Sequence, residues 1–281
     1  MLRQRTAIQR DARAEIIRQL RSTMDQVKAV LAGAPSDYQL WSLPQLQRSM
    51  ELALSEMDQA ISSALGSAAS RSWEAGQELV DGPIEAGGIR ISAVLPEIDI
   101  RQLQAMRTFM TGRIRDISTT IANRINAQLG LVIIGAQSPS DAVAAIKDLL
   151  ETGGRSRAIT ITRTELGRAF STAANERMVA AAEHLPGLRK QWRRSGKIHS
   201  RLHHDSIDGQ IQPMDEPFVL GNGVRIMYPR DPAAPAAETI NCGCESLDYM
   251  ENWDVTNPGK MPFTDQELAL SATKRALEQA A

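Results

Sequence analysis

The feature that most constrains the fold is a long amphipathic pattern that follows Asp99, a residue type that caps helix N-termini. Apolar residues recur there every third or fourth position for about eight turns, as on one buried face of a helix. They are Leu103, Met106, Met110, Ile114, Ile117, Ile121, Ile125 and Leu129. Such stripes are usually helix–helix seams. The alternative is that part of this stripe faces a partner protein.

Two other long amphipathic helices are expected nearer the N-terminus. Residues 8–31 carry apolar residues at helical spacing. Residues 42–45, Ser-Leu-Pro-Gln, have the form of a capping box and open a second helix, whose apolar seam extends to Leu65. The short loop between these helices predicts a helical hairpin.

Shorter helical pieces complete the first half of the chain. One that carries Trp73 is expected to end at Asp81-Gly82-Pro83, because glycine and proline break helices. Another opens at Ser138-Pro139-Ser140-Asp141 and closes at Gly153-Gly154. We therefore predict a helical scaffold and docking region over residues 1–152.

The character of the chain changes after a further helix, expected from about Arg157 to Glu183. Glycines and prolines then punctuate short segments, and Leu188–Trp192 alternates as a strand does. We predict a compact α+β domain with short strands and many loops over residues 153–250, and a C-terminal tail with a short helix over residues 251–281. The fold class is thus a mainly α N-terminal region with long amphipathic helices, followed by this domain.

Composition limits the function classes. The chain has 32 Lys and Arg residues and 33 Asp and Glu residues, so its net charge of -1 gives no global attraction to nucleic acid or a membrane. Aromatic residues make up only 4%, which disfavours an all-β fold. No apolar run approaches the ~18 residues of a membrane span, and the charged N-terminus does not resemble a secretory signal. We expect a soluble chain made in the cytoplasm.

The first helix nevertheless has a local excess of positive charge. Its arginines outnumber its acidic residues by about four over the first turns. Such a face could contact an acidic partner or, non-specifically, DNA phosphates, although a solvated helix face is the more frequent explanation. The arginines are Arg3, Arg5, Arg10, Arg13, Arg18 and Arg21.

The scarce chemical residue types gather between Thr160 and Asp248, where both cysteines and all four histidines lie. An Arg-Thr-Glu helix, a tryptophan segment, Arg-x-x-His before a glycine, a Glu-Pro-Phe segment, a proline turn and Asn-Cys-x-Cys follow one another. This ordered set resembles the phage head morphogenesis family, the Mu F-like minor head proteins, over about residues 156–250. The matching residues are Arg163, Thr164, Glu165, Trp192, Arg201, His204, Gly209, Glu216, Pro217, Phe218, Gly223, Pro229, Glu238, Asn241, Cys242 and Cys244.

Two positions depart from the pattern of that family. Gly196-Lys197 stands where members often carry an acidic residue, and Gly243 stands where an arginine between the cysteines is frequent. A role that needs the acidic side chain or the arginine side chain of the family is therefore in doubt for this chain.

The resemblance implies a structural and assembly protein rather than an enzyme. A minor head protein is assembled in the host cytoplasm into the virion, in the head interior or the portal region. The implied partners are the portal protein and the major capsid protein of the same phage, with DNA packaging or genome delivery as a further role. In this interpretation Arg163, Glu165, Trp192, Arg201, His204, Gly209 and Asn241 are structural motif residues.

A metal site is one alternative for the cysteines. Cys242 and Cys244 can present two thiolates to one ion, and His199, His203 or His204 could complete a tetrahedral site of the type that structural zinc prefers. Buried cysteines also behave as small apolar residues. A metal-free core without any cofactor is favoured, with structural zinc as the alternative.

A catalytic cluster is the other alternative. Arg163, Glu165, Arg201 and His204 could act together, with His204 as general base and an arginine holding an anionic substrate. A buried ion-pair network that fixes loops would use the same residue types. Because no nucleotide-binding or hydrolase motif accompanies them, we assign no catalytic residue. A nuclease, a toxin-like transferase and a DNA-binding module remain alternative functions.

Overall fold

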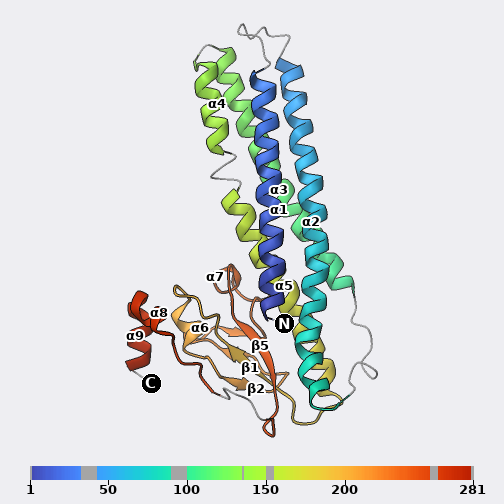
Figure 1. Ribbon diagram of the computed structural model, residues 1–281, viewed down its shortest axis with the longest axis vertical. Coiled ribbons are helices and arrows are strands. Elements are labelled where there is room, and N and C mark those ends of the chain that lie inside the picture. Colours follow the sequence, from blue (N-terminus) through green and yellow to red (C-terminus); the bar gives the residue numbers. More distant parts are fainter. Residues whose placement is uncertain are drawn as a thin grey trace. The chain divides into compact units, whose positions relative to one another are not determined.

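The computed structural model describes residues 2–32, 43–89, 100–134, 136–149, 155–253 and 259–279. Long helices come first and short elements follow (Figure 1). The elements are α1 (Leu2–Ala32), α2 (Leu43–Ala86), α3 (Ile100–Ile133), α4 (Pro139–Asp148), α5 (Arg155–Ala182), β1 (Arg189–Arg193), α6 (Leu202–Asp205), β2 (Ile211–Gln212), β3 (Phe218–Val219), β4 (Arg225–Ile226), α7 (Ala236–Thr239), β5 (Glu245–Tyr249), α8 (Asp265–Leu270) and α9 (Ala272–Gln279). This order confirms the predicted fold class.

The chain forms two compact units. The helical unit consists of Ala7–Ala69 and Gln104–Arg163, and the mixed unit consists of Met1–Thr6, Ser70–Leu103 and Thr164–Ala281. Helices α1, α2, α3 and α5 each contribute residues to both. The predicted boundary between residues 152 and 153 lies outside the described residues and, like the one at residue 250, stays a prediction.

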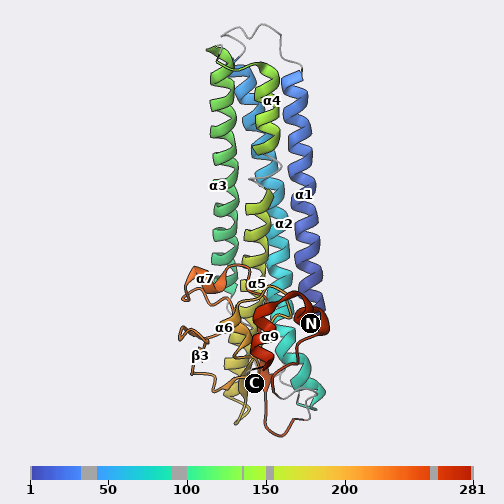
Figure 2. The ribbon, with the colours of Figure 1, turned by 90° about the vertical axis from the view of Figure 1, so that its left-hand side faces the viewer.

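The helical unit is built on the predicted apolar stripes. Its parts of α1, α2 and α3 lie side by side in both views (Figures 1 and 2). The stripe of α3 is buried from Met110 to Leu129, whereas Leu103 and Met106 are only partly buried. Ser138 caps α4 as expected and accepts a hydrogen bond from the Asp141 amide. The proposed caps at Asp99 and Ser42 and the Gly153-Gly154 stop lie outside the described residues.

One predicted helix end is wrong. The expected break at Asp81-Gly82-Pro83 is absent, because α2 continues through Pro83 to Ala86. Packing explains this continuity: Ile84 is fully buried, and Asp81 accepts hydrogen bonds of 2.6 and 2.8 Å from Arg177 of α5. These contacts outweigh the backbone hydrogen bond that a proline removes.

The mixed unit contains a three-stranded antiparallel sheet in the order β2-β1-β5 and a β3-β4 hairpin. Strand β1 was expected to alternate between buried and exposed residues, but everything after Arg189 is buried. Its polar residues are buried because they have partners: the Lys190 ammonium donates to the carbonyl oxygens of Met214 and Met227 at 3.1 and 2.9 Å. Both faces of the central strand are therefore covered.

The C-terminal segment is attached to the mixed unit by charged residues. Glu267 of α8 accepts hydrogen bonds from Arg194 and from Lys274 of α9, both at 2.5 Å. Thr264 and Glu267 form a capping box that starts α8. No helix in the described ranges is long and apolar enough to cross a membrane.

Candidate functional site

The candidate site is a buried cluster formed by α6 and the turn that leads into β5. His204 comes from α6, while Cys242 and Cys244 flank Gly243 in the turn. Trp192 of β1 is fully buried beside them and donates from Nε1 to the His204 carbonyl oxygen at 3.1 Å. The tryptophan of the predicted motif thus positions the backbone of the histidine.

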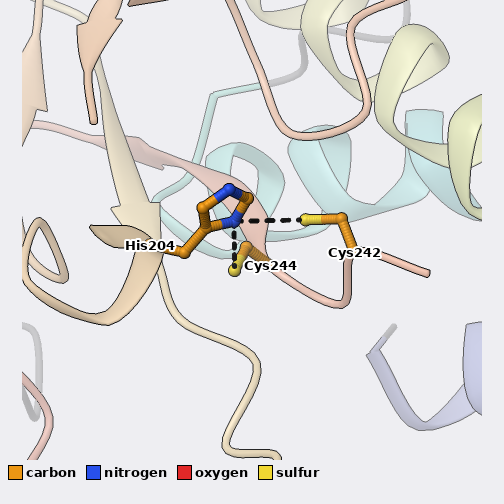
Figure 3. A group of neighbouring side chains, drawn as sticks. All are labelled: His204, Cys242 and Cys244. Carbon is orange, nitrogen blue, oxygen red and sulfur yellow. Dashed lines mark hydrogen bonds between the residues drawn. The ribbon is translucent and has the colours of Figure 1, made fainter. Parts of the chain in front are cut away.

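The three side chains converge on one point (Figure 3). His204 Nδ1 lies 3.7 Å from the Sγ atoms of both Cys242 and Cys244. The exposed fractions are 1% for His204, 7% for Cys242 and 2% for Cys244, so water has little access. Such an arrangement can share a proton between thiol and imidazole or coordinate a cation.

The environment makes the two thiols unequal. A hydrogen bond from Cys244 lowers the pKa of Cys242 against the effect of burial, and His204 and Arg230 lower it further. The same hydrogen bond, together with burial, raises the pKa of Cys244. Burial would lower the pKa of His204, but its contacts with Cys242 and Glu238 raise it overall. Cys242 is thus the more acidic thiol.

Glu238 of α7 orients the other edge of the His204 ring. Its Oε2 atom lies 2.9 Å from Nε2 of His204 and 2.7 Å from Nε2 of His203, and its Oε1 atom accepts from Asn222 at 3.0 Å. Burial acts to raise the pKa of Glu238, but these hydrogen bonds lower it. Of the histidines predicted as metal ligands, His204 joins the cysteines and His203 joins Glu238. His199 is exposed and belongs to neither group.

A buried charge network lies next to the cysteines. The Arg230 guanidinium donates to the Cys242 carbonyl oxygen at 2.9 Å and to Glu245 and Ser171. Arg5 of α1 pairs with the same Glu245. Burial, and secondarily the charge of Arg230, lower the pKa of Arg5 to about 9. The turn is therefore anchored to two helices.

Sequence reasoning missed this network. Arg5 was considered as part of a basic face that is solvated or contacts an acidic partner or DNA, and its pairing with Glu245 removes it from such a face. Glu238 belonged to the matched set without an assigned role. A usable signal for Arg230 was Gly167 on α5, where a Cβ atom would come within 2.9 Å of the arginine side chain.

Three of the four residues considered for catalysis, Glu165, Arg201 and His204, have side-chain partners, whereas among the described residues Arg163 makes a contact only through its backbone. The exposed Arg163 accepts a hydrogen bond from Gln9 through its carbonyl oxygen. Glu165 is buried and pairs with Arg168 at 2.7 Å. Arg201 donates to the Ile240 carbonyl oxygen at 2.8 Å. These contacts favour the alternative of a network that fixes loops.

Two motif residues have backbone roles. Gly209 has a φ of +83°, and a Cβ atom there would lie 2.6 Å from the Gly259 carbonyl carbon, so only glycine fits. Asn241 also lies in the left-handed region with a φ of 55°, which asparagine tolerates. Its amide donates to the Thr164 hydroxyl of α5 at 3.1 Å, which ties the cysteine turn to the helix.

The two departures from the family pattern meet in space. The Lys197 ammonium donates to the Asn241 carbonyl oxygen at 2.7 Å. A Cβ atom on Gly243 would lie 2.9 Å from Lys197 Cε and 2.8 Å from Ser195 Cβ. The lysine therefore occupies the space next to the glycine and places a positive charge over the cysteine turn.

Comparisons with known proteins agree with the ordered motif. Residues 115–247 match the family model described as "Phage Mu protein F like protein", which starts earlier than the expected residue 156. The chain is 34% identical over 115 residues to "Uncharacterized protein YqbB" of Bacillus subtilis (strain 168), covering 40% of this chain and 36% of that protein. It is 30% identical over 95 residues to "NAD(+)--arginine ADP-ribosyltransferase EFV" of Enterococcus faecalis (strain ATCC 700802 / V583), covering 34% of this chain and 19% of that protein.

The chain thus spans about a third and a fifth of the lengths of these two relatives. No solved structure matches. The family match includes the histidine-cysteine cluster, Arg230 with its partners Ser171 and Glu245, and the part of α3 from residue 115 onward. Residues 115–247 thus match the model of the phage Mu F-like family, which is the family that the ordered motif resembles.

Proposed function

We propose that this chain is a minor head protein that acts in phage head morphogenesis near the portal. The observation that carries the proposal is the family match over residues 115–247, which suggests head morphogenesis. The buried contacts of the motif residues support a structural role, because they connect α5, α6 and the cysteine turn. The portal, the major capsid protein and the packaged DNA are the partners that follow from this role.

The helical unit is the proposed docking part. Large apolar side chains remain exposed on it, including Leu52 at 62%, Phe109 at 48% and Ile134 at 74%. Exposed apolar groups at this level stabilise a complex when a partner covers them. Phe109 lies on α3 beside Arg113, whose guanidinium is 5.3 Å from the ring centroid. An aromatic and arginine pair is a frequent anchor of protein interfaces.

The test is made on particles of the phage that encodes the chain. Heads purified from a phage without the gene, complemented with the wild-type chain, are expected to contain it in few copies by quantitative mass spectrometry. Without complementation we expect fewer DNA-filled heads. A normal yield of filled heads without the chain, together with its absence from wild-type heads, would overturn the proposal.

Two full-length variants test the docking part. Phe109→Glu places a charge on the proposed surface and is expected to reduce incorporation into heads at least several-fold. Thr119→Glu adds the same charge at another exposed position of α3 and is expected to be incorporated normally. Equal incorporation of both variants would contradict docking through Phe109.

A transferase activity is the second candidate function. The observation that favours it is the similarity to the ADP-ribosyltransferase, which covers 19% of that protein. Incubation of the purified chain with NAD⁺ and an arginine acceptor tests it directly. We expect no release of nicotinamide above that of heat-denatured protein, and a measurable release would favour the enzyme.

A further inference from the structure

We propose that Cys242, Cys244 and His204 bind one Zn²⁺ ion through their two Sγ atoms and Nδ1, with Glu238 as the residue that positions the histidine. This site is independent of the role in phage heads. It stands on geometry, on burial and on the chemistry of the donor atoms.

The distances fit a tetrahedral zinc ion. Zinc binds cysteine sulfur at about 2.3 Å and histidine nitrogen at about 2.0–2.1 Å, which places the nitrogen and a sulfur about 3.6 Å apart. His204 Nδ1 lies 3.7 Å from each Sγ atom, and all three donor atoms lie within 4.8 Å of one another. An ion can therefore enter with small side-chain adjustments.

The contact between Glu238 and His204 is typical of a zinc ligand. A metal-bound histidine usually donates its other ring N–H to a carboxylate, which fixes the tautomer and the ring orientation. Here Nε2 of His204 lies 2.9 Å from Oε2 of Glu238. With the ring proton on Nε2 in that contact, Nδ1 is the unprotonated nitrogen, and it is the ring atom that faces the two sulfurs (Figure 3). The ring is thus prepared for coordination at Nδ1.

The donor set selects the metal, and its burial indicates the role. Two thiolates and an imidazole suit zinc better than Mg²⁺ or Ca²⁺, which prefer oxygen. The positive charge of Arg230, which donates to the Cys242 carbonyl oxygen, favours the thiolate form that zinc requires. These residues supply three of the four donors that a tetrahedral zinc ion takes. Because the donors are almost fully buried, the ion would join α6 to a turn 38 to 40 residues later.

The experiment uses the untagged full-length chain. After addition of zinc and removal of the excess, elemental analysis is expected to give about one zinc per chain. Titration with Co²⁺ is expected to show thiolate-to-cobalt charge-transfer absorption and the d–d bands of a tetrahedral ion. Both thiols should react with a thiol reagent in the unfolded apo protein, and slowly in the folded zinc form.

Variants separate this site from others. The double variant Cys242→Ser, Cys244→Ser is expected to lose zinc and the cobalt spectrum. Glu238→Gln should keep the tetrahedral spectrum but lower the zinc affinity about 10- to 100-fold, as changes of a carboxylate that holds a metal-bound histidine do. The control His199→Ala, at an exposed histidine, should keep both unchanged.

The wild-type titration needs no variant to fold and therefore decides the question. No stoichiometric zinc and no charge-transfer band in the folded wild-type chain would overturn the proposal in favour of a metal-free, hydrogen-bonded cluster. Zinc retained in full by the double cysteine variant would also overturn it, because the ion would then be bound elsewhere.

Discussion

The two units of the molecule are stabilised by different kinds of contacts. The core of the helical unit consists of apolar side chains from the stripes of its helices, such as Leu54, Ile61 and Ile121. The mixed unit has an apolar core around Trp192 and further buried apolar residues on α2 and α5, such as Phe170, but it also buries many charged groups, Arg230 among them. Stability rests on transfer of apolar surface in the first unit, and on apolar burial together with specific pairing of charges in the second.

This difference determines how each unit responds to a mutation. Truncation of an apolar side chain removes transfer free energy and leaves a cavity whose cost depends on local collapse. Loss of one member of a buried ion pair leaves the other charge without compensation in a medium that solvates it poorly. We therefore expect the largest single effects in the mixed unit.

Glu245→Gln tests this expectation at the carboxylate that pairs with two arginines. Glu245 accepts from Arg230 and Ser171 and pairs with Arg5, so the change removes the carboxylate that the two arginines share. We expect the free energy of unfolding to fall by about 3–5 kcal/mol. Urea denaturation followed by circular dichroism measures it.

Glu251→Gln is the matched control, because this glutamate is exposed only six positions later in the chain. We expect a change within about 0.5 kcal/mol. Equal effects of the two substitutions would show that the buried network contributes little and would remove the contrast between the units.

The sequence predicted the helical unit better than the site, and particular residues show why. The stripe around Ile114 and Ile121 is a local repeat, so its period alone identified the buried face. Pro83 predicted a helix end that the structure does not have. The prediction failed because the local sequence does not show the burial of Ile84 or the pairing of Asp81 with Arg177. Contacts between residues far apart in the sequence thus stabilised the helix in spite of its glycine and proline.

The candidate site was predicted in its donors but not in their partners. Cys242, Cys244 and His204 were recognised because these residue types are scarce and ordered. That Glu238 orients His204, and that Arg5 reaches Glu245, depends on chain segments brought together by folding. Local sequence patterns do not predict such contacts. A glycine inside a helix, such as Gly167, indicates only that another group packs closely there, in this case Arg230.

The helical unit offers a matched pair on a single helix. Leu54 of α2 is 3% exposed and Leu52 is 62% exposed. Leu54→Ala is expected to lower the free energy of unfolding by about 2–5 kcal/mol through lost burial and a cavity. Leu52→Ala should change it by no more than about 0.5 kcal/mol. Urea denaturation of both variants provides the measurement, and a large loss with Leu52→Ala would mean that this side chain is covered in solution.

The smallest expected effect concerns the pH dependence of the mixed unit. Burial raises the pKa of Asp248, on β5, to about 7, and its Oδ2 atom is buried without a hydrogen-bond partner among the described residues. An unfolded aspartate has a pKa of about 3.9. The folded protein therefore holds a proton that the unfolded chain releases, and this contribution makes stability fall as the pH rises from about 4 to 7.

Asp248→Asn removes that proton linkage. We expect the variant to be more stable than the wild-type chain by roughly 1–2 kcal/mol at pH 8 and nearly equal to it at pH 4, a figure reduced from the full pKa shift because the residue is partly exposed. Urea denaturation at several pH values up to 8 measures the difference. Higher pH is avoided because burial lowers the pKa of Lys190, which pairs with Asp248 on the neighbouring strand, to about 8.

The control Asp116→Asn changes an exposed aspartate of α3 and should follow the wild-type profile. A pH profile of Asp248→Asn that runs parallel to the wild-type profile would contradict the raised pKa. It would show that burial of Asp248 does not lower the stability of the mixed unit as the pH rises.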